Sequence, residues 1–219
     1  MNRVIAIDGP AGAGKSSASR GLAQRLGFAY VDTGAMYRIV GVLAHEQGIA
    51  LDDDAALATL CAGIVFEVRG ERLAANGRDL SEVIRRRDAG DIASRVSTRP
   101  VVRERLVALQ RNLGGQGGVV MEGRDIGTVV FPDAPLKFFL TADPLVRAQR
   151  RAAELAARGE TVDVAELARE LAERDRRDRG RPTAPLKPAA DAIELDTSAL
   201  ALEAVIAEME RVARQRLSL

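Results

Sequence analysis

An eight-residue segment near the start of the chain has the spacing of a phosphate-binding loop. Residues 9–16 read Gly-Pro-Ala-Gly-Ala-Gly-Lys-Ser, which fits the pattern G-x-x-x-x-G-K-[ST]. Glycines let such a loop turn tightly and point backbone N–H groups at phosphate oxygens. Lys15 would place its charge on the β- and γ-phosphates, and the Ser16 hydroxyl would ligate Mg²⁺. The segment therefore predicts a site for a nucleoside triphosphate.

Arginines gathered around acidic residues form three further clusters. The first cluster is residues 32–38, which follow a short apolar run. The second is Glu122-Gly123-Arg124-Asp125. The third, residues 173–181, holds five arginines in nine positions. A charge run of this kind is usually a solvated helix face with i,i+4 ion pairs. Beside a phosphate loop, however, arginine forks are suited to the spread-out charge of a phosphoryl group in transfer. Glu122 follows an apolar run directly, a position suited to steering Mg²⁺ through its waters.

The elements that must position these residues alternate between strand-like and helical patterns. Continuous apolar runs predict five buried parallel strands at residues 4–7, 28–31, 119–121, 136–140 and 192–195. Helical patterns lie between them, at about residues 16–26, 35–47, 101–113, 145–158 and 200–217. This order predicts the α/β class, a doubly wound three-layer core with a five-stranded parallel sheet.

Two regions interrupt the alternation. Residues 64–80 contain strand-like segments around Asn76-Gly77, the strongest short hairpin signal, and predict a small antiparallel sheet. Residues 162–187 predict a charged helix that ends before Pro182. An insert and an arginine-rich flap are typical of an enzyme that closes over its substrates.

Composition excludes several other classes. A net charge of +1 argues against a general nucleic-acid or membrane-surface binder. A single cysteine, Cys61, excludes an internal disulfide and a thiolate metal cage, and a single histidine, His45, leaves little for histidine-based catalysis. Without a signal-like leader or a long apolar run, the chain is expected to be cytoplasmic, with no membrane partner. We also expect a monomer.

The motifs together resemble the bacterial cytidylate kinase family. The resemblance rests on residues 9–16, 32–38, 122–134 and 174–181 and runs nearly from end to end, and Gly-Arg-Asp-Ile-Gly-Thr-Val-Val-Phe-Pro-Asp-Ala at 123–134 is its most specific part. It implies transfer of the γ-phosphate of ATP to CMP or dCMP with Mg²⁺. It also implies one kinase domain over residues 1–219, with a nucleoside monophosphate-binding insert at about 38–112 and a lid at about 159–188.

The resemblance further implies a role for each matching position. ATP would bind at Gly9, Pro10, Ala11, Gly12, Ala13, Gly14, Lys15, Ser16 and Ser17. The cytosine would be read by Ser94, Arg103 and Asp125, and the sugar hydroxyls would be held by Asp178 with Thr33. The acceptor phosphate and the group in transfer would be surrounded by Arg38, Arg124, Arg174 and Arg181, with Lys15, Arg124, Arg174 and Arg181 as the catalytic set. Thr33 and Glu122 depart from the serine and aspartate common in the family, which bears on the preference between CMP and dCMP.

Two other functions remain open at this point. A phosphate-loop kinase for another small acceptor, such as UMP, AMP or a non-nucleotide metabolite, would use the same loop and arginines. A nucleotide-dependent switch would instead hydrolyse slowly without an acceptor. The density of arginine argues against a switch, because a switch keeps few cations in its own chain.

Overall fold

The computed structural model describes residues 3–69, 72–86, 89–115 and 117–219. The chain forms two compact units, the first from residues 1–30 with 116–219 and the second from residues 31–115. In the described ranges, no helix is both long and apolar enough to cross a membrane.

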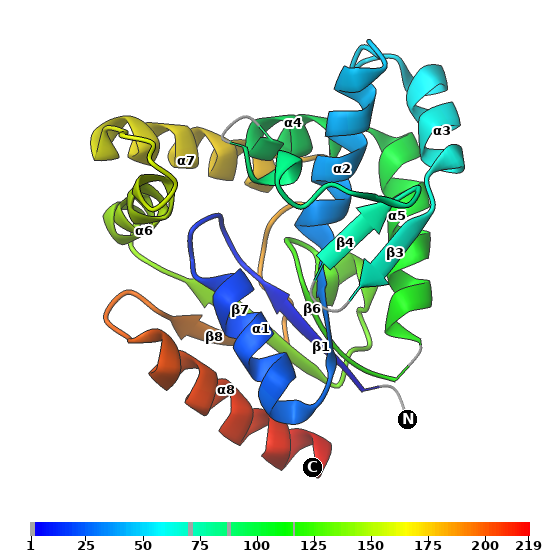
Figure 1. The fold of residues 1–219 in the computed structure, drawn as a ribbon. Coiled ribbons are helices and arrows are strands. Elements are labelled where there is room, and N and C mark those ends of the chain that lie inside the picture. Colours follow the sequence, from blue (N-terminus) through cyan, green and yellow to red (C-terminus); the bar gives the residue numbers. More distant parts are fainter. Residues whose placement is uncertain (1–2, 70–71, 87–88, 116) are drawn as a thin grey trace. The chain divides into compact units, whose positions relative to one another are not determined.

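A parallel sheet is the centre of the first unit (Figure 1). Its strands are β1 (Arg3–Asp8), β2 (Ala29–Asp32), β6 (Gly118–Glu122), β7 (Leu136–Thr141) and β8 (Ile193–Asp196), in the order β2-β6-β1-β7-β8. β1 pairs with β6 and β7, with Ile7 opposite Glu122 and Asp8 opposite Phe139. All five predicted strands and the α/β class are confirmed. Because the strands are parallel, the residues that follow β1 and β6 emerge at the same edge.

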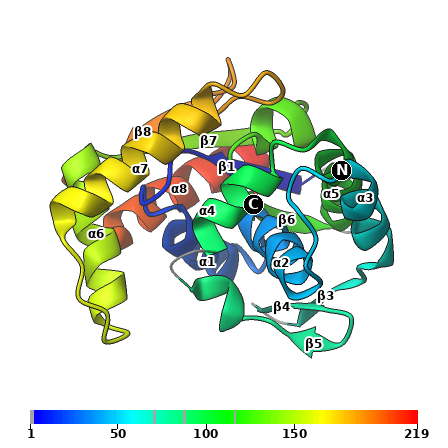
Figure 2. The same cartoon turned by 90° about the horizontal axis from the view of Figure 1, so that it is seen from above.

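Four helices accompany this sheet: α1 (Lys15–Leu26), α6 (Pro144–Ala156), α7 (Val164–Arg179) and α8 (Leu202–Leu217). α1 and α8 pack together over the sheet, where Leu22 and Met209 share an apolar cluster with Phe138. α6 and α7 lie side by side (Figure 1, Figure 2) and share a smaller cluster with Leu155 and Leu167. Each predicted helix is present, with ends shifted by up to two residues.

The second unit combines α2 (Thr33–Glu46), α3 (Asp54–Gly63), α4 (Ala89–Val96) and α5 (Pro100–Gly114) with a short helical turn, η1 (Val83–Arg85). Its small sheet joins β3 (Phe66–Arg69), β4 (Arg72–Ala75) and β5 (Arg78–Asp79) in that order, all antiparallel. Asn76 and Gly77 connect β4 to β5 with φ angles of 51° and 74°, as a tight hairpin turn requires. The predicted hairpin is confirmed, whereas α3 and α4 were not predicted.

Gly41 sets how closely α2 and α4 approach within the second unit. A Cβ at this position would lie 2.4 Å from Cγ2 of Ile92 on α4. We expect Gly41→Ala to destabilise the protein by about 1–3 kcal/mol despite the better helix propensity of alanine, because overpacking dominates. Gly63→Ala in α3 is the matched control, because among the described residues no atom from outside its own stretch of helix lies within 4 Å of that Cβ. Urea unfolding of both variants measures the effect, and equal stabilities would contradict the packing argument. Adding Ile92→Ala to Gly41→Ala should relieve the clash.

Candidate active site

The loop at residues 9–14 has the backbone geometry of an anion cradle. Gly9, Gly12 and Gly14 have φ angles of 146°, 75° and 81°, which favour glycine. At Gly9 a Cβ would lie 2.1 Å from the Leu140 carbonyl oxygen, so no side chain fits there. α1 begins directly after Gly14, which has no side chain to cap the helix, so the first N–H groups of α1 face the loop. Ser16 and Ser17 are exposed in this first turn.

Lys15 is the central cation of the first unit. Only 5% of its surface is exposed, and its Nζ donates to the Pro10 carbonyl oxygen at 2.7 Å. Burial, together with nearby Arg124 and Arg174, lowers the pKa of Lys15 to about 7, while Glu122 and Asp8 act in the opposite direction. Buried Lys15 thus lies within electrostatic reach of the half-buried Arg124 and Arg174, and a bound anion would relieve the repulsion among the three cations.

Acidic residues stand at the carboxyl ends of β1 and β6. The Asp8 carboxylate is 4% exposed and accepts from the N–H groups of Ile126 and Gly127, each at 2.8 Å. Burial raises the pKa of Asp8 to about 6, although these two hydrogen bonds oppose the shift. Glu122 is also 4% exposed and accepts from the Tyr30 hydroxyl at 2.5 Å. Sequence reasoning identified Glu122 but missed Asp8 and Tyr30, although Asp8 stands in the same position after its strand.

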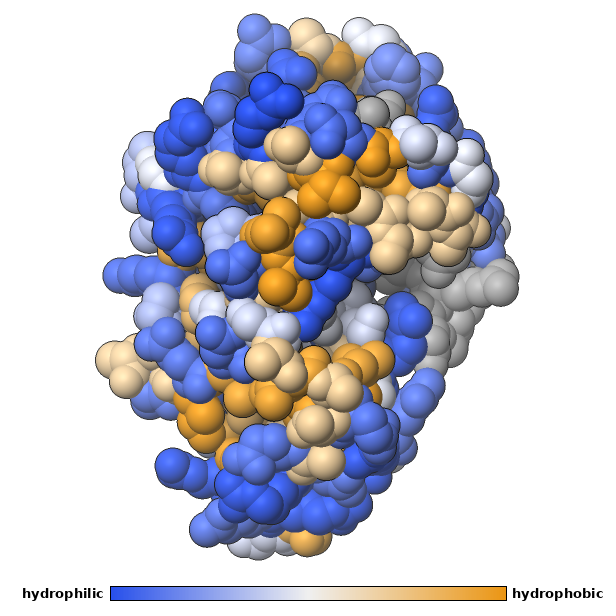
Figure 3. All heavy atoms as spheres, turned by 90° about the vertical axis from the view of Figure 1, so that its left-hand side faces the viewer, coloured by the Kyte–Doolittle hydropathy of each residue, from blue (hydrophilic) through white to orange (hydrophobic). Residues whose placement is uncertain are grey.

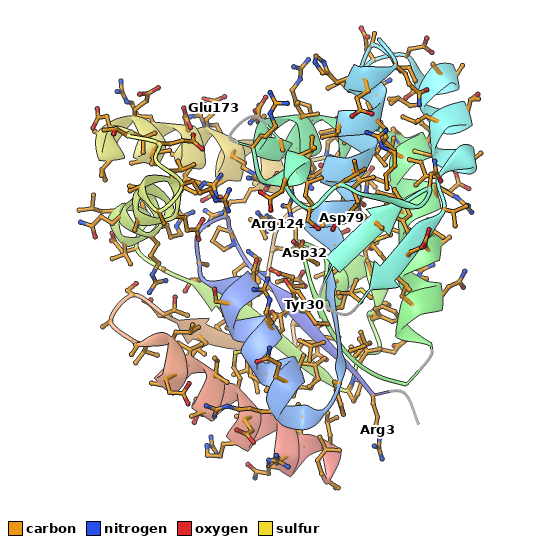
Figure 4. The ribbon with its side chains drawn as sticks, in the orientation of Figure 1. Arg3, Tyr30, Asp32, Asp79, Arg124 and Glu173 are labelled. Atoms are coloured by element: carbon orange, nitrogen blue, oxygen red, sulfur yellow. The ribbon has the colours of Figure 1, made fainter. Side chains whose placement is uncertain are left out.

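A buried carboxylate joins two of the predicted phosphate-binding arginines. Asp178 on α7 is 1% exposed, accepts from Nε of Arg124 at 3.1 Å and also pairs with Arg181. Burial acts to raise the pKa of Asp178, but Arg124, Arg181 and Arg174 outweigh it and hold the pKa below its usual value. Because it contacts both side chains, Asp178 fixes the orientation of Arg124 and Arg181. Figure 4 shows Arg124 at the carboxyl edge of the sheet, whereas Arg3 lies at the opposite end of β1.

The charge run on α7 is divided between two faces of the helix. Leu167, Leu171, Asp175 and Asp178 are the buried residues of α7. Their spacing places them along one side of the helix. Exposed Glu173 and Arg176 lie 3.4 Å apart as a surface ion pair on this helix, and the face drawn in Figure 3 combines hydrophilic side chains with apolar patches. The charge run therefore includes both a solvated face and a buried one.

Side chains from α6 and the chain after β8 hold the phosphate loop from outside. Arg147 donates to the Ala11 carbonyl oxygen at 3.0 Å and pairs with Asp175 at 2.6 Å. The Thr197 hydroxyl lies 3.1 Å from the Ala13 carbonyl oxygen and accepts from Arg150 at 2.9 Å. Sequence reasoning missed these residues, because each contact joins segments far apart in the chain.

The other predicted acceptor-binding residues belong to the second unit. Asp32 caps α2 by accepting from the Ala35 N–H at 3.0 Å, and its second oxygen pairs with Arg38 at 2.6 Å. Thr33 begins the same helix and is 3% exposed. Ser94 on α4 and Arg103 on α5 are 2% and 5% exposed. Asp125, their predicted partner in reading a base, is 6% exposed and belongs to the first unit.

The donor atoms at the loop suit a hard divalent cation. The Ser16 hydroxyl and the Glu122 carboxylate are oxygen donors of the kind that Mg²⁺ prefers. Among the described residues, no three His, Cys, Asp or Glu side chains converge as in an all-protein cage. An ion here would take most of its ligands from phosphate and water, as Mg²⁺ does with nucleotides.

Comparison with known proteins identifies relatives over nearly the whole chain. The sequence model of the family described as cytidylate kinase matches residues 5–215. A cytidylate kinase of Geobacter sp. (strain M21) is 52% identical, over 98% of this chain and 94% of that protein. One of Geobacillus sp. (strain WCH70) is 46% identical over 97% of both chains.

A bifunctional pantoate ligase/cytidylate kinase of Synechococcus elongatus is 48% identical over 97% of this chain and 42% of its own length.

Solved structures share the fold at low sequence identity. A shikimate kinase from Bacteroides thetaiotaomicron has a TM-score of 0.51 and 14% identity, covering 99% of this chain and 98% of that one. A gluconokinase from Sinorhizobium meliloti has a TM-score of 0.50 and 17% identity, covering 99% and 95%. The fold is thus that of phosphate-loop kinases. The sequence comparisons identify the family within that fold: the chain belongs to the cytidylate kinase family.

Proposed function

We propose that this protein transfers the γ-phosphate of ATP to CMP or dCMP, which gives ADP and CDP or dCDP. The match to cytidylate kinases over residues 5–215 carries the choice of acceptor. The gathering of Arg124 and Arg174 around Lys15 supports the phosphoryl transfer itself, because cations held close together stabilise the charge that spreads over the transferring group.

The donor ATP binds along the phosphate loop. Backbone N–H groups of residues 9–17 surround its phosphates, Lys15 contacts the β- and γ-phosphates, and the positive end of α1 adds to the attraction. Ser16 would ligate an Mg²⁺ ion that accompanies the nucleotide, and Glu122, which accepts from Tyr30, would hold its waters. The ion would supply neutralisation of phosphate charge.

The acceptor is recognised through its base, its sugar and its phosphate. The Asp125 carboxylate accepts from the exocyclic amine of cytosine, while Ser94 and Arg103 donate to its N3 and O2 atoms. Uracil has a carbonyl in place of the amine, which the Asp125 carboxylate repels. Asp178 and Thr33 hold the sugar hydroxyls, and Arg38, Arg124, Arg174 and Arg181 contact the acceptor phosphate.

The reaction needs no general base. The acceptor phosphate is already ionised near neutral pH, so its oxygen attacks the γ-phosphorus in line as the bond to ADP loosens. Lys15, Arg124, Arg174 and Arg181 stabilise the charge in transit. The lid at about residues 159–188 and the insert at about 38–112, parts of one kinase domain, close over the substrates and exclude water, which would otherwise hydrolyse ATP.

We also propose that the enzyme works in the cytoplasm, where both of its small-nucleotide substrates occur. We propose that it acts as a monomer and needs neither a nucleic acid nor a membrane for activity.

ADP formation with a panel of acceptors tests the proposed function. With Mg²⁺ and ATP, CMP and dCMP should react faster than UMP and AMP. Asp125→Asn should lower the preference for CMP over UMP by about tenfold or more, because the amide can donate to the uracil carbonyl. Equal rates with every acceptor would indicate another kinase, and slow hydrolysis that ignores the acceptor would indicate a switch.

Substitution of single arginines at residues 174–181 distinguishes a catalytic role from a general effect of charge. Arg181→Ala should lower kcat by about 10²-fold or more, because its buried guanidinium stabilises the transferring group. Arg174→Ala should act in the same direction. Arg176→Ala and Arg179→Ala are matched controls, since both side chains are exposed, and their kcat should stay within about twofold. Similar losses in all four variants would contradict the assignment.

The lowered pKa of Lys15 predicts a pH-dependent affinity for ATP. In the free protein this pKa is about 7, so Lys15 is largely neutral at pH 9 and must take up a proton to bind phosphate in its charged form. Between pH 7 and pH 9 the Kd for ATP should therefore rise by about tenfold or more. Lys15→Gln is the control, because ATP itself titrates equally with both proteins. If the Kd ratio of the two proteins does not change with pH, this account of Lys15 is wrong.

A further inference from the structure

Asp8 connects the phosphate loop to the segment that carries Arg124 and Asp125. Asp8 is the last residue of β1, and the phosphate loop begins at the next residue, Gly9. Its two carboxylate oxygens are both occupied, one by the N–H of Ile126 and the other by the N–H of Gly127, each at 2.8 Å. A buried ionised acceptor makes stronger hydrogen bonds than a neutral one. One side chain therefore holds the start of a second loop.

That second loop is fastened to β1 at two points. The Gly123 N–H donates to the Ile7 carbonyl oxygen at 2.9 Å, which continues the pairing of β6 with β1. The bonds from Ile126 and Gly127 to Asp8 form the other point. Only Arg124 and Asp125 lie between the two attachments, so their backbone has little freedom to move.

Asp8 also caps the helical turn that follows Asp125, in place of the Asp125 side chain. Residues 126–130 form a single π-helical turn, η2, with Asp125 in the N-cap position. The Asp125 side chain makes no capping hydrogen bond, and Asp8 accepts from the first N–H groups of the turn instead. An acidic N-cap residue commonly uses its own carboxylate in this way. Capping by Asp8 leaves the Asp125 carboxylate to point elsewhere.

Gly127 packs closely against the side chains of Lys137 and Asp8. A Cβ on Gly127 would lie 3.1 Å from Cδ of Lys137 and 3.4 Å from Oδ2 of Asp8. Lys137 is itself held by Asp191 at 2.8 Å. A side chain at position 127 would therefore press mainly on Lys137, whereas its distance to Asp8 would be an ordinary van der Waals contact.

We propose that Asp8 is a positioning residue for acceptor recognition: by capping η2 it fixes Arg124 and Asp125 relative to the phosphate loop. Asp8 touches neither substrate and acts through the backbone of residues 123–127. The inference rests on the proposed function, in which Asp125 reads cytosine and Arg124 contacts the acceptor phosphate.

Steady-state kinetics of two Asp8 variants test the proposal. Asp8→Asn keeps the volume but turns one acceptor into a donor that opposes an N–H group. Asp8→Glu keeps the charge and both acceptors but moves them by one methylene group. Both variants should raise KM for CMP by about tenfold and lower the preference for CMP over UMP, and Asp8→Glu, which keeps the negative charge, should leave KM for ATP within about twofold of wild type. Unchanged preference with only a lower Tm would overturn the proposal.

An effect through charge alone has a different signature. Asp8 also stabilises the charge of Lys15, so a purely electrostatic role would leave Asp8→Glu near wild type and would raise KM for ATP in Asp8→Asn. That pattern overturns the positioning role. Should Asp8→Asn fail to fold, Asp8→Glu decides alone, because the positioning role still predicts a loss of CMP preference in that variant.

Amide hydrogen exchange separates this inference from the proposed function. In wild type the Ile126 and Gly127 amides should be protected, and Asp8→Asn should increase their exchange rates by about tenfold or more. Retained protection overturns the inference whatever the substrate. If the wild-type protein instead shows no preference for CMP, the proposed function fails, and the exchange result alone decides the role of Asp8.

Discussion

Buried positive charge is the constraint on which the rest of the first unit depends. Lys15 is almost fully buried within reach of Arg124 and Arg174, so its pKa falls to about 7. Like charges in a region of low dielectric are costly unless acidic groups stand nearby. Glu122 and Asp8 supply part of that compensation, and the phosphates of a nucleotide would supply the rest. The free protein thus holds a site whose electrostatics are completed by its ligand.

The parallel sheet is what makes this concentration of charge possible. Asp8 and Glu122 end neighbouring strands, so their carboxylates emerge at the same edge as the phosphate loop. Contacts from distant segments then fix the loop: Arg147 and Thr197 both reach its carbonyl oxygens. Because the loop is held from several directions, its N–H groups need little rearrangement to receive phosphate, which is the advantage of a preorganised site.

α7 shows how one helix can serve two environments. Its outer face carries exposed ion pairs such as Glu173 with Arg176, which contribute little to stability. Its inner face begins with leucines that pack against α6 and ends with Asp175 and Asp178, each paired with arginine. Removing either acid would leave a buried arginine without its partner, which is far more costly than losing a surface pair. The helix is therefore both an anchor and a carrier of the arginine cluster.

The sequence by itself determined the features that local patterns encode. The phosphate loop, the five apolar strands, the Asn76-Gly77 turn and the end of α7 before Pro182 all depend on residues close together in the chain. α3 and α4 were not predicted because helices of 10 and 8 residues are too short for a helical period to stand out from a loop. The candidate site was predicted as a set of residues but not as a set of partners. Tertiary structure alone decided that Asp178 joins Arg124, 54 residues away, that Arg147 pairs with Asp175, and that Asp8 caps η2. These contacts arise when the fold brings distant groups together in a buried region, where each charge and N–H group must find a partner.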